Sequence, residues 1–163
     1  MSTFNNGGGT LKSITKPAAL LEIAHLTNEA ERSASTVDVT LDNVTINDDT
    51  GARTVTIDAT LPVGSTTNAS GQIVVSATNY LGGSPFNPGT GGEIKASSFP
   101  ASLLEMAQFL AVSEQAVTPV APNNITISID LEGLTASISA TLPVVPSLDG
   151  AGKPVFTATD YLP

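Results

Sequence analysis

The chain has 163 residues, a length that fits one domain or two small ones. Hydrophobic residues make up 40% of it, which suffices for a core of Ile, Leu, Val and Ala. Its 15 acidic and 6 basic residues give a formal net charge of −9, which argues against binding to nucleic acid or to an anionic membrane surface, because both need clustered Lys and Arg. The chain has no Cys, so disulfides and thiolate metal sites are excluded.

The chain begins with an arm rich in Gly, Asn, Ser and Thr, at residues 1–13, whose composition predicts flexibility. It lacks the basic and apolar regions of a signal peptide, and no apolar run in the chain reaches membrane-spanning length. We therefore expect synthesis in the cytoplasm, or export without a cleaved signal. If the arm is ordered, either a neighbouring subunit or the chain's own body must hold it.

After the arm, the sequence repeats itself. Residues 56–81 align with 137–162 without a gap, and 12 of the 26 paired positions are identical. Residues 17–24 recur at 100–107. We predict two copies of one helix–hairpin–strand unit, which pack together about a pseudo-two-fold axis because either alone would be marginally stable. The predicted organisation is an arm at 1–13, unit 1 at 14–81, a Gly/Pro-rich linker at 82–98 and unit 2 at 99–163.

Each unit is predicted to open with a helix that carries Pro17 or Pro100 in its first turn. Glu22 and Glu105 follow near the helix starts, where the helix dipole favours negative charge. The second helix is more apolar, through Phe109 and Val112, and is expected to contact more than one surface. Apolar or small residues spaced for one buried helix face are Leu20, Ile23, Ala24 and Thr27, and Leu103, Met106, Ala107 and Leu110.

A hairpin follows each helix, as strict alternation of apolar and polar residues indicates. Two-residue turns are predicted at Glu132-Gly133 and at Gly51-Ala52. An earlier apolar run at 37–41 is out of phase with the first strand, so we expect a bulge at Asp42-Asn43 or a separate strand. The predicted strand pairs are Val44–Ala59, Ile46–Ile57, Ile127–Ile138 and Ile129–Ala136.

Pro62 and Pro143 are predicted to end the second strand of each unit, since proline lacks a ladder donor. Loops at 64–71 and 145–152 then lead to a third strand. The third strands are predicted at about 72–79 and 153–160. Together these elements predict an α+β fold with antiparallel, sandwich-like sheets and one helix per unit.

Tyr80 and Tyr161 recur at the ends of the third strands. A recurring Tyr is either a ligand contact or a cover over the core whose hydroxyl reaches water, and we favour the cover.

One segment matches a catalytic signature. Asp49-Thr50-Gly51-Ala52 resembles the Asp-Thr-Gly-Ala signature of retroviral-type aspartic proteases, in which paired Asp carboxylates share a proton. Here Asp48 precedes it, where that family has an apolar residue, and the second unit has Leu131-Glu132-Gly133 instead. We interpret the segment as a hairpin turn.

The other candidate sites also have structural explanations. The carboxylates of Asp42, Asp48, Asp49 and Asp58 lack the ligand spacing of a dedicated Ca²⁺ site, and we interpret them as solvated turns. His25, the only histidine, is expected on the exposed side of its helix. Gly89-Thr90-Gly91-Gly92 is a linker rather than a phosphate loop. The glycosylation triplets at Asn43, Asn68 and Asn124 matter only in a eukaryotic secretory pathway. We assign no catalytic, cofactor-binding or metal-binding residue, expect no cofactor, and do not expect an enzyme.

The outer faces of the predicted strands carry Thr and Ser, and no predicted strand contains Lys. Soluble proteins often protect strand edges with Lys, so another element or another subunit is expected to cover these edges. Alternatively, Thr and Ser are there because they suit strands. The neutral positions of these faces are Thr54, Thr56 and Thr60, and Ser137, Ser139 and Thr141.

In composition and repeated architecture, the whole chain resembles bacteriophage and viral virion components, which are often small, acidic, Cys-free and rich in Thr, Ser, Asn and Gly. The resemblance implies a non-enzymatic structural subunit of a virion, such as a capsid decoration or cement protein or a neck or tail component. Its partners would be copies of itself and other structural proteins. The alternative is a secreted or cell-surface binding or adhesion module, although glycan binding usually needs exposed aromatic residues and the chain has no Trp.

Overall fold

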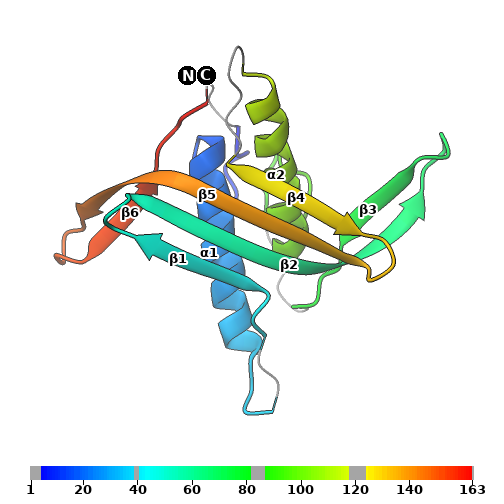
Figure 1. Cartoon of the computed structure of the whole chain (residues 1–163), viewed down its shortest axis with the longest axis horizontal. Coiled ribbons are helices and arrows are strands. Elements are labelled where there is room, and N and C mark those ends of the chain that lie inside the picture. Colours follow the sequence, from blue (N-terminus) through cyan, green and yellow to red (C-terminus); the bar gives the residue numbers. More distant parts are fainter. Residues whose placement is uncertain (1–4, 39–40, 82–86, 118–123, 163) are drawn as a thin grey trace.

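The computed structural model describes residues 5–38, 41–81, 87–117 and 124–162. In this part of the chain, six antiparallel strands form one sheet, and two helices cover one of its faces (Figure 1). The predicted α+β class is therefore confirmed. The elements are α1 (Lys16–Ala34), β1 (Val44–Asp49), β2 (Thr54–Thr67), β3 (Ile73–Ala77), α2 (Phe99–Gln115), β4 (Ile125–Asp130), β5 (Thr135–Leu148) and β6 (Pro154–Ala158).

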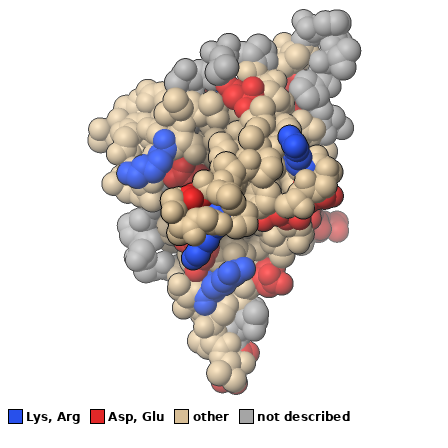
Figure 2. Space-filling model, turned by 90° about the vertical axis from the view of Figure 1, so that its left-hand side faces the viewer, with Lys and Arg blue, Asp and Glu red and all other residues tan. Residues whose placement is uncertain are grey.

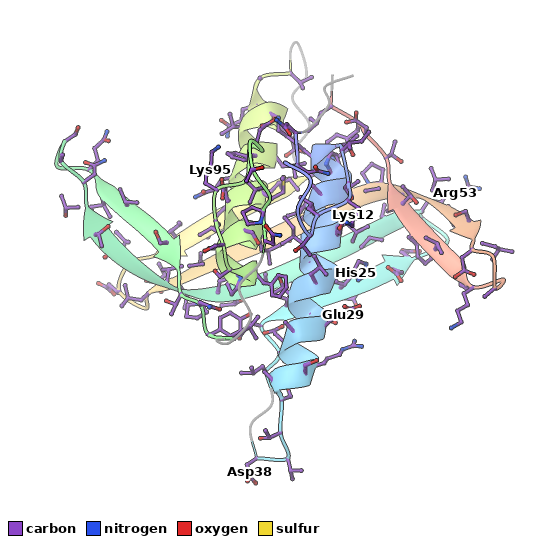
Figure 3. All side chains as sticks on the ribbon, turned by 180° about the vertical axis from the view of Figure 1, so that it is seen from behind. Lys12, His25, Glu29, Asp38, Arg53 and Lys95 are labelled. Carbon is purple, nitrogen blue, oxygen red and sulfur yellow. The ribbon has the colours of Figure 1, made fainter. Side chains whose placement is uncertain are left out.

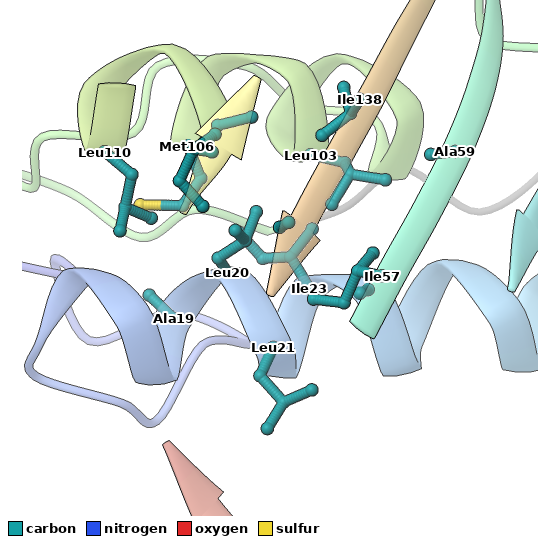
Figure 4. Close-up of a cluster of buried hydrophobic side chains, with 14 of the residues drawn as sticks. Ala19, Leu20, Leu21, Ile23, Ile57, Ala59, Leu103, Met106, Leu110 and Ile138 are labelled. Atoms are coloured by element: carbon teal, nitrogen blue, oxygen red, sulfur yellow. The ribbon is translucent and has the colours of Figure 1, made fainter. Parts of the chain in front are cut away.

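Both helices carry a proline in the first turn, as predicted, and each also begins at a capping residue. Thr15 and Ser98 cap them, each accepting a hydrogen bond from a first-turn N–H, and Pro17 and Pro100 occupy the first turn. All eight residues of the predicted apolar faces are buried. The helices run in opposite directions (Figure 1), and their apolar side chains meet one another and the central strands in a single core (Figure 4).

One expectation about the helices is wrong. Glu22 and Glu105 lie beyond the first turn, and their carboxylates do not cap the helix. They accept backbone N–H groups from the segment that precedes each helix, including Ser13 at 2.8 Å and Ala96 at 2.9 Å. The more apolar second helix does contact more than one surface, since it packs against α1 and against β3 and β4. Phe109 packs against the core, whereas Val112 is 67% exposed and adds no packed surface.

The four predicted strand pairs are confirmed, but the turns are longer than predicted. Each hairpin closes through four residues, 50–53 and 131–134, because pairing stops at Asp49–Thr54 and Asp130–Thr135. The Asp side chains stabilise these longer turns: Asp49 accepts the N–H of Ala52, and Asp130 accepts two loop N–H groups. Neither a bulge nor a separate strand precedes β1 in the described residues; Val39 of the expected run lies outside them.

The prediction that Pro62 and Pro143 end their strands is wrong, because β2 and β5 continue for five more residues. Along β2, alternate N–H groups point to β1, and Thr60 N–H donates to Asn43 there. Pro62 is the next residue on that side, beyond the end of β1, and its carbonyl accepts the N–H of Thr78. The Thr78 carbonyl accepts the N–H of Tyr80 instead, so the missing N–H of Pro62 leaves no acceptor without a donor. The third strands are confirmed in shorter form, as β3 and β6.

The two halves of the chain meet at the centre of the sheet, whose strand order is β1-β2-β5-β4. Asp58 of β2 pairs with Ser139 of β5, which is also its partner in the sequence repeat. Consequently the ladder is symmetrical about this point, with Ile57 opposite Ala140 and Ala59 opposite Ile138. Both predicted units thus contribute to one sheet and one core.

Residues 5–13 of the arm are held by the chain's own body. Thr10 N–H donates to the Asn87 carbonyl at 2.7 Å, and Glu93 N–H donates to the Asn5 carbonyl at 2.8 Å. Leu11 is only 1% exposed and belongs to the core. The described part of the arm therefore pairs with the segment that precedes α2. Of the two expected alternatives, a neighbouring subunit or the chain's own body, the second holds it.

Candidate functional site: two wings and an open sheet face

Two hairpin extensions project from opposite ends of the central sheet. They arise because β2 and β5 have 14 residues each, whereas their neighbours β1 and β4 have six. The free ends pair with β3 and β6 instead. We call residues 63–77 the β2–β3 wing and residues 144–158 the β5–β6 wing; Figure 1 shows them at the right and left of the sheet.

Both wings expose apolar side chains. Ile73 of the β2–β3 wing is 62% exposed, and Leu148 of the β5–β6 wing is 70% exposed. Val145 and Val155 add further exposed apolar surface to the β5–β6 wing. On the side of the molecule that carries this wing, neutral side chains make up most of the surface, with acidic and basic groups interspersed (Figure 2). Exposed apolar side chains on projecting hairpins are typical of surfaces that contact another protein.

A groove of about 290 Å³ lies between α1 and the β5–β6 wing. Its apolar lining includes Leu21, Leu26 and Phe156, and His25 and Glu29 also line it. Figure 3 shows His25 and Glu29 on the side of α1 that faces this wing. On the other side of the molecule, α2 packs beside β3 in the matching place. Each helix is thus flanked by a wing.

The sheet face opposite the helices is open. Its centre is a shallow depression of about 230 Å³, lined mainly by hydroxyl side chains and by the carboxylate of Asp58. Along β5, Ser137, Ser139 and Thr141 are all exposed on this face. No described helix covers it (Figure 1). The face can offer hydrogen bonds but little apolar contact.

Two buried carboxylates were not predicted from the sequence. Glu31 and Glu114 are 1% and 2% exposed, at the ends of the buried helix faces. Glu31 accepts the backbone N–H groups of Asn43 and Val44, at 2.9 and 3.0 Å, and so fixes the start of β1 on α1. Glu114 binds Asn124 and Ile125 in the same way at the start of β4.

Each carboxylate also accepts the hydroxyl of a tyrosine. Tyr80 donates to Glu31 at 2.9 Å, and Tyr161 donates to Glu114 at 2.9 Å. The favoured interpretation as a cover is confirmed, since both tyrosines pack against the core, but each hydroxyl binds a buried carboxylate, which was not expected. Burial, together with the hydrogen bond and the negative charge of the glutamate, raises the pKa of both tyrosines well above the ordinary value.

This arrangement predicts alkaline unfolding. Below pH ~10 the tyrosines are protonated in the folded and unfolded states, so their stabilising effect is complete. Above that pH only the unfolded chain loses these protons, and stability falls until the folded pKa is passed. Since these are the chain's only two Tyr, tyrosinate absorbance should rise together with the loss of circular dichroism. Tyrosinate formation at the ordinary pKa, without unfolding, would contradict this.

The structure separates the remaining candidate residues. Asp49 lies at a hairpin end and binds its own turn, whereas Asp58 lies at the centre of the open face. The described residues contain no group of three His, Asp or Glu side chains placed to hold a metal ion. His25 is exposed, and Asn68 lies in the loop of the β2–β3 wing. Gly89, Gly91 and Gly92 lie in the segment that pairs with the arm.

The described surface presents exposed apolar side chains on the wings and hydroxyl groups on the open sheet face. Neither described helix is long and apolar enough to cross a membrane. No family model matches the sequence, and no curated protein or solved structure is significantly similar to it. The function is therefore inferred from the wings, the grooves and the sheet itself.

Proposed function

We propose that this protein is a non-enzymatic structural subunit of a virion-type assembly, such as a capsid decoration or cement protein or a neck or tail component. The observation that carries the proposal is the pair of wings, which gives one chain two similar projecting surfaces with exposed Ile73 and Leu148. A subunit that bridges neighbours needs two such surfaces on opposite sides of a rigid body. The shared core between α1, α2 and the sheet supplies that body.

The composition supports the same proposal. A chain with net charge −9 and only six basic residues is poorly suited to binding nucleic acid. This favours other proteins as its binding partners. The alternative, a secreted glycan-binding module, has less support. The chain's only two Tyr direct their hydroxyls to buried glutamates, so neither is a free aromatic platform.

The wings can be tested with a matched pair of variants. Leu148→Asp places a charge on the β5–β6 wing, while Val37→Asp places the same charge at a fully exposed position outside both wings. Both should change the free energy of unfolding by no more than about 0.5 kcal/mol, since neither side chain is buried. We expect Leu148→Asp alone to abolish the formation of rings, fibres or particle-bound protein, measured by sedimentation and by negative-stain microscopy.

Two results would contradict the proposal. In one, the wild-type protein stays a monomer at high concentration and binds no particle component. In the other, Leu148→Asp and Val37→Asp assemble equally well, so the wing is not the contact.

A further inference from the structure

The central sheet ends in two edge strands, β1 and β4, that occupy matching places in the two halves. Each starts under a buried glutamate, as described above. Thr60 N–H donates to the Asn43 carbonyl, and Thr141 N–H donates to the Asn124 carbonyl. The carbonyls of Asn43 and Asn124 therefore point inwards, to the central strands. By the alternation of an antiparallel ladder, Ile127 and Ile129 direct their N–H and C=O groups outwards. No described strand pairs with this outer edge of β4.

The β1 edge is protected by polar and charged groups. Asn28 of α1 donates its side-chain N–H to the Val44 carbonyl at 2.8 Å, which occupies one outward acceptor. Arg32 and Ile46 line a second groove, which lies between α1 and β1. Asp48 is the last residue of β1 whose backbone N–H and C=O groups point away from β2. Charged residues at such positions disfavour pairing with another strand.

The β4 edge lacks all three of these groups. The matching residues are Ala111 for Asn28, Gln115 for Arg32 and Ile129 for Asp48. The carbonyl of Ile125 therefore has no counterpart of the Asn28 bond, and Ile129 is a 39% exposed apolar side chain. Within one molecule, one edge is protected and its counterpart is not. The difference is specific to the edge, since both halves keep the same pairing register.

We propose that the β4 edge pairs with the β4 edge of a second copy of this chain, antiparallel, about a two-fold axis at Ser128. Glu114 already accepts the N–H of Ile125, so the outward groups that remain fully available are those of Ile127 and Ile129. Ser128 lies midway between them. An axis there pairs Ile127 of each copy with Ile129 of the other and satisfies all of these groups.

The charges of β4 identify a second copy as the partner. The strand is neutral except for Asp130 at its end. In this register Asp130 faces Thr126 of the other copy, so no like charges oppose each other despite the net charge of −9 per chain. The alternation of the two faces also continues across the axis, with Ile on the helix side and Thr and Ser on the open side. The central sheets of two copies then form one continuous sheet.

Cysteine crosslinking tests this register directly, because the chain has no cysteine of its own. Ser128 is exposed, and a non-hydrogen-bonded pair at the axis has its Cα atoms about 4.5 Å apart, within the range of a disulfide. Ser128→Cys should form a covalent dimer under mild oxidation. Asn47→Cys, the matching position on β1, is the control and should crosslink at least about tenfold more slowly, because nothing holds two β1 edges together.

A second variant tests whether the β4 edge forms the dimer, without adding a disulfide. Ile129→Asp copies the protecting residue of β1 and should raise the Kd of the dimer at least about tenfold, measured by analytical ultracentrifugation, with unchanged circular dichroism. Equal crosslinking rates of Ser128→Cys and Asn47→Cys would overturn the inference. So would a wild-type chain that is monomeric at its highest soluble concentration.

This inference deepens the proposed function by naming the partner at one edge, but it has a separate test. If Ser128→Cys fails to crosslink while assembly remains sensitive to Leu148→Asp, only the β4 dimer is lost. If the β4 dimer forms but Leu148→Asp has no effect on assembly, the wings are excluded as contacts and the dimer stands.

Discussion

Replacing Glu114 with Ala should lower the free energy of unfolding by about 3 kcal/mol or more. The carboxylate is 2% exposed and accepts three hydrogen bonds, from the N–H groups of Asn124 and Ile125 and from the hydroxyl of Tyr161. The substitution leaves these donors without an acceptor, at a cost of roughly 1–3 kcal/mol for each one that stays buried. Chemical denaturation followed by circular dichroism measures the loss.

Two companion variants separate the carboxylate from its tyrosine. Tyr161→Phe removes a single hydrogen bond and should cost about 1 kcal/mol. Glu132→Ala removes an exposed carboxylate in the β4–β5 turn and should change stability by less than about 0.5 kcal/mol. If Glu114→Ala were no more destabilising than Glu132→Ala, the carboxylate would not be what fixes β4 to α2.

Gly9→Ala is the second large expected effect and should detach the arm. A Cβ atom at this position would lie 2.3 Å from the carbonyl oxygen of Asn87 and 2.3 Å from the backbone N of Gly89. Both contacts are backbone atoms, so the two segments must separate. Leu11, now 1% exposed, then leaves the core, and we expect a loss of about 2 kcal/mol.

Limited proteolysis reads out this separation directly, because a detached arm is cut more readily. Gly64→Ala is the matched control: a Cβ atom there meets nothing within 4 Å, and the position lies in an exposed strand. It should leave both stability and cleavage of the arm unchanged. Equal cleavage of Gly9→Ala and Gly64→Ala would show that the close approach does not hold the arm.

Much of the fold follows from local apolar patterning. Helix faces and strand registers were predictable because each places apolar residues at a fixed period, which only one arrangement buries. The prediction that Pro62 ends its strand failed because the residue alone does not reveal which side of the strand needs an N–H donor. That depends on where β1 ends, which is a property of the neighbouring strand.

The buried glutamates were missed although a signal exists. Glu31 continues the apolar stripe of α1 four residues after Thr27, and Glu114 does the same after Leu110. A carboxylate on the core side of a helix is expected only where backbone donors meet it, and those donors come from strands more distant in sequence. Similarly, Gly8-Gly9 recurs as Gly91-Gly92, which marks the two segments that cross.

We expect the central β2–β5 ladder to form after the two hairpins. Each helix and its hairpin join neighbouring parts of the chain, but this ladder pairs Thr54 with Pro143 and Pro62 with Thr135, across the whole linker. Such non-local pairing forms slowly, because the entropy of closing a long loop is lost before any stabilising contact forms. During synthesis the inner edge of β2 therefore stays without its partner until the second half of the chain has emerged from the ribosome.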